Sequence, residues 1–297
     1  MTSPPSIPPH PSPSMKNYTA IITGAGSSEP TGISNGRASA ILLAEAGCNV
    51  LCVDLSLPWA ESTVAMISSS NIPRAIAVAA DVTKPEDCER IVKLALDEFG
   101  RVDILVNNVG IGGPPGTAVE VDVAAWARGL EVNVTSMMLM AKYAIPAMQL
   151  NEPRGDVRGS IVNMGSVAGL RGGTPSLLYP TSKGAIVNMT RAMAAHHARQ
   201  GIRVNCVCPG MLYTPMMYAG GKMDEETRQK RKERSLLGTE GTAWDCAAVV
   251  RFLAGPEARW VTGSVQTVDA GASCATSTDV PNALSSGLKE GGEEEGV

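Results

Sequence analysis

Short apolar runs alternate with longer stretches of helical pattern along most of the chain. The apolar runs predict buried strands at residues 18–22, 49–54, 75–80, 102–106, 161–164, 203–208 and 264–268. Helical patterns occur between most of them, at residues 38–46, 84–99, 122–149, 179–200 and 242–253. Thr83 is the expected N-cap of the second of these helices. This alternation predicts a single doubly wound parallel sheet with helices on both faces, a three-layer α/β/α fold.

Both ends of the chain depart from this pattern. Residues 1–16 are rich in proline and lack the charged and apolar regions of a signal peptide, so we expect a disordered or extended leader. Residues 274–297 have little apolar content and end in GGEEEGV, which predicts a flexible acidic tail. No break in composition divides residues 17–273, which are expected to form one catalytic domain.

Composition and charge narrow the possible classes of function. A net charge of −4 and a pI near 5.5 argue against a nucleic-acid partner. No apolar run approaches the ~20 residues that a membrane span needs. The seven cysteines are scattered, and no CxxC pair accompanies the three histidines. We therefore expect reduced thiols, no metal site and a cytoplasmic location.

The segment from Gly165 to Lys183 carries the strongest chemical signal. Tyr179 and Lys183 are four residues apart, which places them on one face of a helix. An ammonium group one turn away would lower the pKa of the phenol, which could then exchange a proton with an alcohol or ketone oxygen. Ser166 follows a predicted strand, where its hydroxyl would hold the substrate oxygen. Because Tyr-x-x-x-Lys also occurs by chance in helices, the interpretation depends on a cofactor site.

A glycine-rich turn follows the first strand and precedes the first helix. In TGAGSSEPTGISNG the glycines Gly24, Gly26, Gly32 and Gly36 are irregularly spaced, as if residues 27–31 were inserted. A strand, a glycine turn and a helix N-terminus together form a cradle for a pyrophosphate, although many such loops are only turns. The spacing does not decide which glycine fills which place.

Acidic residues end the next two predicted strands. Asp54 closes residues 49–54, where a carboxylate accepts hydrogen bonds from the adenosine ribose and repels a 2′-phosphate. It therefore favours NAD over NADP, with a solvated loop aspartate as the alternative. Asp81, followed by Val82, closes the third strand, where the acid could reach the adenine amino group.

Two further segments bear on the site. Asn133 lies among apolar residues in a long helical pattern, either as a satisfied core amide or as a perturbation of the helix that holds a water. Residues 211–218 are rich in methionine and tyrosine, and the highly charged residues 224–234 follow them. Beside an active site, these residues predict a mobile lid over an apolar substrate.

In this order the pieces resemble the short-chain dehydrogenase/reductase family over residues 18–273. The matching pieces are TGAG at 23–26, Asp54, Asp81-Val82, NNVG at 107–110, Asn133, Ser166, YPTSK at 179–183, PGMLYT at 209–214 and VDAG at 268–271. The resemblance implies a Rossmann-type fold, a nicotinamide cofactor and a homotetramer or dimer formed through the helices that hold Asn133 and Tyr179. The lengthened glycine turn departs from the family's pattern.

Site residues follow from the same resemblance. The implied catalytic set is Asn133, Ser166, Tyr179 and Lys183. Cofactor contacts are implied for Gly24, Ser27, Gly32, Ile33, Asp54, Asp81, Val82, Asn108, Gly110, Tyr179, Lys183, Leu212 and Thr214. Tyr179 would act as acid or base, Lys183 would lower its pKa and hold the nicotinamide ribose, and Asn133 would anchor a proton-relay water.

The sequence thus predicts an NAD-dependent oxidoreductase that transfers a hydride between nicotinamide and a secondary alcohol or ketone. The apolar lid favours a bulky substrate, such as a terpenoid, steroid or polyketide alcohol of specialised metabolism. Arg171 and Arg128 could instead meet a substrate carboxylate, although solvated surface arginines are the simpler interpretation. The competing hypotheses are a ketoreductase for acyl-thioester or polar carbonyl substrates, and a dinucleotide-binding regulator without catalysis.

Overall fold

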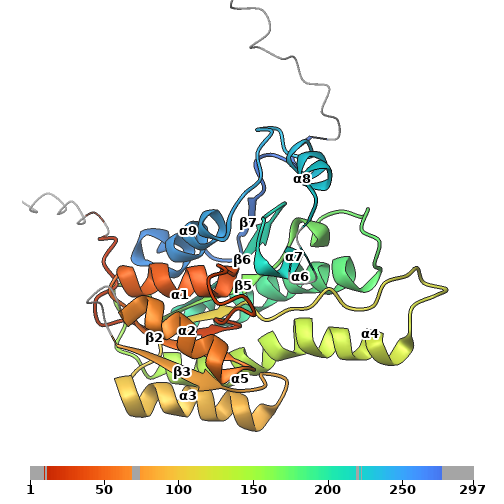
Figure 1. Ribbon diagram of the computed structural model, residues 1–297. Helices are drawn as coiled ribbons and strands as arrows, with labels where there is room; N and C mark the ends of the chain where they lie inside the picture. Colours follow the sequence, from red (N-terminus) through yellow and green to blue (C-terminus); the bar gives the residue numbers. More distant parts are fainter. Residues whose placement is uncertain (1–9, 11, 69–73, 219–220, 222, 276–297) are drawn as a thin grey trace, which may run out of the picture.

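Seven parallel strands form one sheet in the computed structural model, which describes residues 10, 12–68, 74–218, 221 and 223–275 (Figure 1). The strands are β1 (Thr19–Thr23), β2 (Asn49–Asp54), β3 (Ala75–Ala79), β4 (Ile104–Asn107), β5 (Gly159–Met164), β6 (Ile202–Pro209) and β7 (Val265–Val268). Their order, β3-β2-β1-β4-β5-β6-β7, confirms the doubly wound parallel sheet. It reverses between β1 and β4, and ligands of such sheets bind beyond the carboxyl ends of the strands at this reversal.

Helices cover both faces of the sheet (Figure 1). On one face pack α1 (Asn35–Glu45), α2 (Leu57–Ser68) and α9 (Ala243–Ala254). On the other face pack α3 (Pro85–Phe99), α5 (Ser136–Gln149) and α6 (Leu178–His197). The three remaining helices are α4 (Val123–Leu130), α7 (Pro215–Tyr218) and α8 (Glu225–Lys232) within the described residues. Because the central strands are buried on both faces, they form continuous apolar runs in the sequence.

The predicted helix over residues 122–149 is interrupted. Asp122 caps α4 by accepting a hydrogen bond from the N–H of Ala125 at 2.7 Å. A single π-helical turn (Glu131–Thr135) then joins α4 to α5. Such turns are frequent at functional sites, and this one carries Asn133. The helix is therefore perturbed at Asn133, which is one part of the second alternative that the sequence left open, while the water of that alternative stays a prediction.

Two local predictions about helices are corrected. The sequence pattern misses α2, although Pro58 in its first turn is a helix-start signal. Thr83 does not cap α3, because its hydroxyl donates to Asp81 Oδ1 at 2.7 Å. Lys84 takes the capping position without a side-chain hydrogen bond, and Pro85 opens the helix.

The packed domain begins earlier than the predicted boundary at residue 17. Met15 is fully buried, and its N–H donates to the carbonyl of Ala46 at 2.7 Å. This contact joins the start of the chain to the end of α1, so Met15 belongs to the core and not to a disordered leader. Residues 1–9 and 11 of the predicted leader, and residues 276–297 of the predicted tail, lie outside the described residues.

A fully buried arginine holds the lengthened glycine turn in place. Arg37 Nη1 donates to the carbonyls of Glu29, Pro30 and Gly32 at 3.3, 3.0 and 2.6 Å. Its Nε donates to Thr63 Oγ1 of α2 at 3.0 Å. A buried guanidinium is tolerated only when its donors are used. Here they fix the inserted residues against α1 and α2.

Replacing this arginine should loosen the turn. Arg37→Met leaves the turn's carbonyls without their donor in a buried place, which should lower the free energy of unfolding by about 3 kcal/mol. We expect the midpoint of thermal unfolding to fall by roughly 5–10 °C. Arg37→Lys, which keeps one charged donor, should lose less. An unchanged midpoint in Arg37→Met would show that the turn does not depend on this side chain.

Candidate active site

One strand end and two helical segments bring the four catalytic candidates together. Ser166 follows β5, Tyr179 and Lys183 lie on α6, and Asn133 lies in the π turn. Gly169 allows the approach, because a Cβ there would lie only 2.4 Å from the carbonyl carbon of Lys183. The short 3-10 turn Val167–Gly169 therefore packs directly on the backbone of α6 and holds Ser166 beside Tyr179.

The electrostatics of the Tyr179–Lys183 pair differ from the prediction. Burial raises the pKa of Tyr179 above its ordinary value, and a hydrogen bond with Ser166 offsets only part of that rise. Lys183 Nζ lies 5.7 Å from the tyrosine ring centroid and donates to the carbonyl of Met164 at 2.9 Å. Burial lowers the pKa of Lys183 to about 8. The prediction that the protein lowers the pKa of Tyr179 is thus wrong, because desolvation of the phenol dominates.

Asn133 is fully buried, and both the oxygen and the nitrogen of its side-chain amide form hydrogen bonds. Its Oδ1 accepts from the N–H of Ile111 at 2.8 Å. Its Nδ2 donates to the carbonyl of Ile111 at 2.9 Å and to Ser182 Oγ at 3.0 Å. The side chain thereby ties the loop after β4 to α6. It is a satisfied core amide, and the proton-relay water stays a prediction.

The structure identifies the glycines that form the turn at the start of α1. Gly24 has a φ of +64°, which favours glycine. A Cβ on Gly36 would lie 2.0 Å from the carbonyl oxygen of Gly24, so α1 can begin there only with glycine. Asn108 Nδ2 donates to the same carbonyl at 3.0 Å. Gly24 and Gly36 therefore form the close contact at the start of α1.

Asn35 is a site residue that the sequence reasoning missed. It lines a small cavity together with Asn108, Gly110 and Lys183. Its Oδ1 is buried without a hydrogen-bond partner among the described residues. An unsatisfied acceptor beside a helix N-terminus fits the ribose–phosphate part of a dinucleotide, whose hydroxyls donate and whose phosphates bind free N–H groups. The Asn-Gly pair at the start of the first helix was the available signal.

The acidic strand ends shape the same edge of the sheet. Asp54 Oδ2 accepts from the N–H of Gly26 at 2.9 Å, which joins the end of β2 to the glycine turn. Asp81 Oδ1 accepts from both the N–H and the hydroxyl of Thr83. The side chain of Val82 is buried in the core with α3.

Three predicted cofactor residues lie in or beside the inserted part of the turn. A Cβ on Gly32 would lie 2.8 Å from Cγ of Pro215, so Gly32 packs against α7. Ile33 packs against Ala38 and its neighbours. Ser27 Oγ accepts from the N–H of Glu29 at 3.2 Å. Among the described residues, the lining of the cavity at Asn35 does not include Ser27, Gly32 or Ile33, and their cofactor contacts stay predictions.

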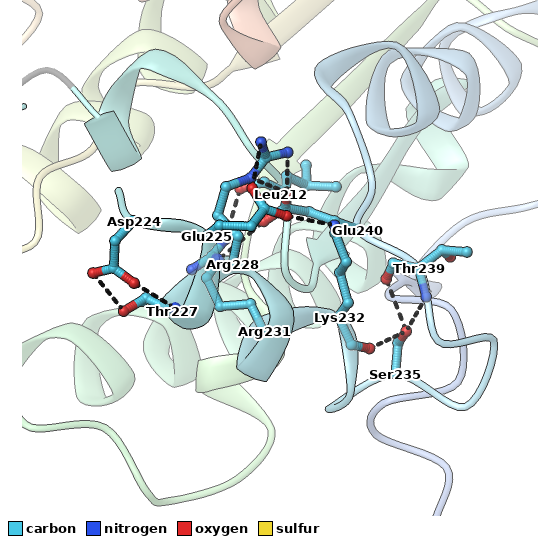
Figure 2. A network of polar contacts seen from close by, with 10 residues as sticks. All are labelled: Leu212, Asp224, Glu225, Thr227, Arg228, Arg231, Lys232, Ser235, Thr239 and Glu240. Carbon is cyan, nitrogen blue, oxygen red and sulfur yellow. Dashed lines mark hydrogen bonds and ion pairs between the residues drawn. The ribbon is translucent and has the colours of Figure 1, made fainter. Parts of the chain in front are cut away.

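The turn that carries Leu212 is fastened to α8. Arg231 donates to the carbonyl of Leu212 at 2.9 Å. Figure 2 shows Glu240 with both Arg228 and Arg231, at 2.9 and 3.1 Å. These contacts fix the charged segment after β6 over the carboxyl end of the sheet. Thr214 is buried just before α7, and its carbonyl accepts from the N–H of Met217 at 2.8 Å.

Two adjoining cavities meet at Tyr179. The smaller has a volume of about 110 Å³ and contains Asn35 and Lys183 in its lining. The larger has a volume of about 920 Å³ and is lined by loop residues and by the segment after β6. Both share the residues Ser166, Tyr179, Gly210, Leu212 and Met217. The smaller cavity can take the part of a cofactor that lies nearest the phenol, and the larger cavity can hold a substrate.

Arg128, membrane-spanning helices, metal ligands and the cysteines are the other features on which the sequence bears. Arg128 pairs with Glu131 at 2.7 Å, and the described lining of the larger cavity does not include it. The described helices include none that combines the length and apolar character of a membrane span. Likewise, no group of three potential metal ligands comes together among these residues. All seven cysteines are free thiols, and Cys274 is exposed.

Known proteins share this architecture. The family model described as enoyl-(acyl carrier protein) reductase matches residues 26–273. 2-(S)-hydroxypropyl-CoM dehydrogenase 3 of Xanthobacter autotrophicus is 39% identical over 260 residues, covering 86% of this chain and 97% of that protein. Cis-4-hydroxycyclohexanecarboxylate dehydrogenase of Sinomonas cyclohexanicum is 35% identical, covering 85% and 95%. A crystal structure described as a short-chain dehydrogenase/reductase of Burkholderia xenovorans has a TM-score of 0.80 at 37% identity, covering 89% and 99%.

The chain therefore belongs to the short-chain dehydrogenase/reductase family. Its relatives include dehydrogenases of small secondary alcohols, so the protein is an oxidoreductase of the alcohol dehydrogenase type. Enzymes of this family use a nicotinamide dinucleotide, and the buried acceptor of Asn35 and the close contact at Gly36 fit such a group.

The raised pKa of Tyr179 can be measured directly. In the cofactor-free protein, the phenolate absorbance of Tyr179, taken as wild type minus Tyr179→Phe, should develop only above pH about 10, the ordinary value for tyrosine. The sign follows from burial, which disfavours the charged phenolate and keeps the neutral phenol to higher pH. A midpoint below pH 9 would contradict this account.

Proposed function

We propose that the protein is an NAD-dependent dehydrogenase that interconverts a secondary alcohol and its ketone. The meeting of two cavities at Tyr179, with Ser166 beside it, carries the proposal. Hydride transfer at an oxygen-bearing carbon needs a proton donor or acceptor between the cofactor and the substrate. Tyr179 lies at that boundary. The dehydrogenases of hydroxylated small molecules among the relatives support the same reaction class.

The side chains divide the proposed reaction among them. When bound, NAD supplies the hydride acceptor at C4 of its nicotinamide ring. Ser166 Oγ holds the substrate oxygen, and Tyr179 Oη takes the hydroxyl proton in oxidation or donates it in reduction. Because burial keeps the phenol protonated at neutral pH, Tyr179 is ready for reduction, whereas oxidation needs its proton removed first.

Lys183 is suited to pass that proton on, through a water that Asn133 would help to hold. Both face Gly110, where a Cβ would lie 3.3 Å from Lys183 Nζ and 3.5 Å from Asn133 Oδ1. With a pKa of about 8, the Lys183 ammonium releases a proton more easily than an exposed lysine does. A water held beside Gly110 would complete the relay.

The charges around the glycine turn support NAD over NADP. Asp54 places a carboxylate at the end of β2, where a 2′-phosphate would meet a like charge. An arginine near the glycine turn could bind the 2′-phosphate of NADP. Arg37 follows that turn in the sequence, but it is buried and its donors bond the carbonyls of the turn. We therefore assign the adenosine ribose to Asp54.

The size of the larger cavity supports a substrate with a bulky apolar body. Met211, Met217 and Leu236 contribute apolar surface to its 920 Å³. Met216 and Met217 of α7 border the smaller cavity and Tyr179. Terpenoid, steroid or polyketide alcohols of specialised metabolism have suitable bodies. We also propose that the enzyme works in the cytoplasm as a homo-oligomer, with the exposed apolar side chains of Val123 and Met138 covered by the partner.

The decisive experiment for the reaction replaces the proposed acid/base. Tyr179→Phe should lower kcat by roughly 100-fold or more, the usual contribution of a positioned general acid or base. NAD binding, followed by calorimetry, should remain measurable. Tyr143→Phe on α5 is the matched control and should keep full activity. NAD binding by a wild-type protein that oxidises no secondary alcohol in a broad screen would favour the regulator hypothesis.

A second experiment tests the cofactor. Calorimetric titration should show that NAD binds at least about tenfold more tightly than NADP, because close like charges oppose binding. Asp54→Asn keeps a hydrogen-bond acceptor and removes the charge, so the preference should shrink. Asp97→Asn, an exposed change on α3, is the control. Equal or tighter binding of NADP by the wild type would refute the assignment of Asp54.

A further inference from the structure

Three arginines line the larger cavity beside Tyr179. They are Arg171, Arg231 and Arg234, and none of the described residues in that lining carries a carboxylate. The chain as a whole has a net charge of −4, so this concentration of positive charge runs against the protein's average. A cleft lined by one sign of charge raises the local concentration of ligands of the opposite sign.

Arg231 is already engaged by the protein. Its Nε lies 3.1 Å from Glu240 Oε1, and its Nη2 donates to the carbonyl of Leu212 (Figure 2). Glu240 is almost wholly buried and also accepts from Arg228. We therefore assign Arg231 to holding α8 in place and not to binding a ligand.

Arg234 differs from the other cations of its segment. Lys230 pairs with Glu226 at 2.6 Å, and Lys232 pairs with Glu225 at 3.4 Å. Within the described residues, Arg234 has no ion-pair partner. It lies two residues after the end of α8, and its N–H donates to the carbonyl of Arg231, which fixes its backbone at the cavity. Its guanidinium is exposed and available to a ligand.

Arg171 lines the same cavity and comes from a different part of the chain. It lies five residues after Ser166, just beyond the turn that packs on α6. Its Nη1 donates to the carbonyl of Ala272 at 2.6 Å, which anchors the side chain, and its other donors have no hydrogen-bond partner within the described part of the chain. Among the described residues, no carboxylate neutralises it. An anchored guanidinium is a good partner for an oxyanion because less side-chain freedom is lost on binding.

We propose that Arg171 and Arg234 bind an oxyanion of the substrate, so that the enzyme acts on a secondary alcohol or ketone whose apolar body carries a carboxylate or sulfonate. The inference rests on the proposed function and deepens it. Met211, Met217 and Leu236 contact the apolar body, and the arginines hold its acidic end while the carbinol faces Tyr179. Guanidinium groups suit this task because their planar donors match oxyanions in pairs.

The test compares a neutral alcohol with an alcohol of the same ring that carries a carboxylate. Cyclohexanol and cis-4-hydroxycyclohexanecarboxylate share a ring and a secondary hydroxyl, and kcat/KM is measured for both with NAD. The wild type should prefer the carboxylate. Arg234→Gln and Arg171→Gln should each lower the ratio of carboxylate to neutral turnover by about tenfold, the effect of losing one charge-assisted hydrogen bond. Arg199→Gln, beyond the far end of α6, should leave the ratio unchanged.

The outcomes separate this inference from the proposed function. Oxidation of cyclohexanol without preference for the carboxylate, or an unchanged ratio in both arginine variants, would overturn the oxyanion site and leave the dehydrogenase intact. If neither alcohol reacts, the proposed function fails for these substrates, and the site is judged by binding alone. Calorimetry with cyclohexanecarboxylate and cyclohexanesulfonate should then show affinity that Arg234→Gln weakens, and no affinity for either anion would overturn the site.

Discussion

A backbone contact without intervening side chains, made possible by Gly169, holds the active site together. It seats the turn after β5 directly on α6 and so fixes Ser166 against Tyr179. Gly165 lets the same turn pack closely against β6, since a Cβ there would lie 2.7 Å from Cys206 Sγ. The chemistry of the site therefore depends on small residues in its support as much as on the reactive ones.

Burial explains why the reactive pair behaves differently from the pair expected on an isolated helix. The spacing of Tyr179 and Lys183 indicates that they share a face, and they do. On a solvated helix the ammonium would favour the phenolate. In the folded protein both groups are desolvated, which favours the neutral form of each. The charge state of the pair is thus a property of the cavity, and spacing along the chain does not reveal it.

The sheet and most catalytic candidates could be predicted because they depend on local signals. Strands buried on both faces are continuous apolar runs, and Asp54 and Ser166 stand directly after such runs. The π turn could not be predicted in this way, since it depends on contacts of Asn133 with Ile111 and Ser182, which come from distant parts of the chain. The role of Asn35 could not be predicted either. Because of the insertion, the spacing of the glycines does not show where α1 begins, and Asn35 is its first residue.

The lengthened glycine turn also contacts the helix that borders both cavities. Gly32 packs against Pro215 and Tyr218, so the turn at the start of α1 touches α7, which borders both cavities. Arg37 ties that turn rigidly to α1 and α2. An outward movement of α7 would break these contacts, so the same fixed turn would resist the opening of either cavity on that side.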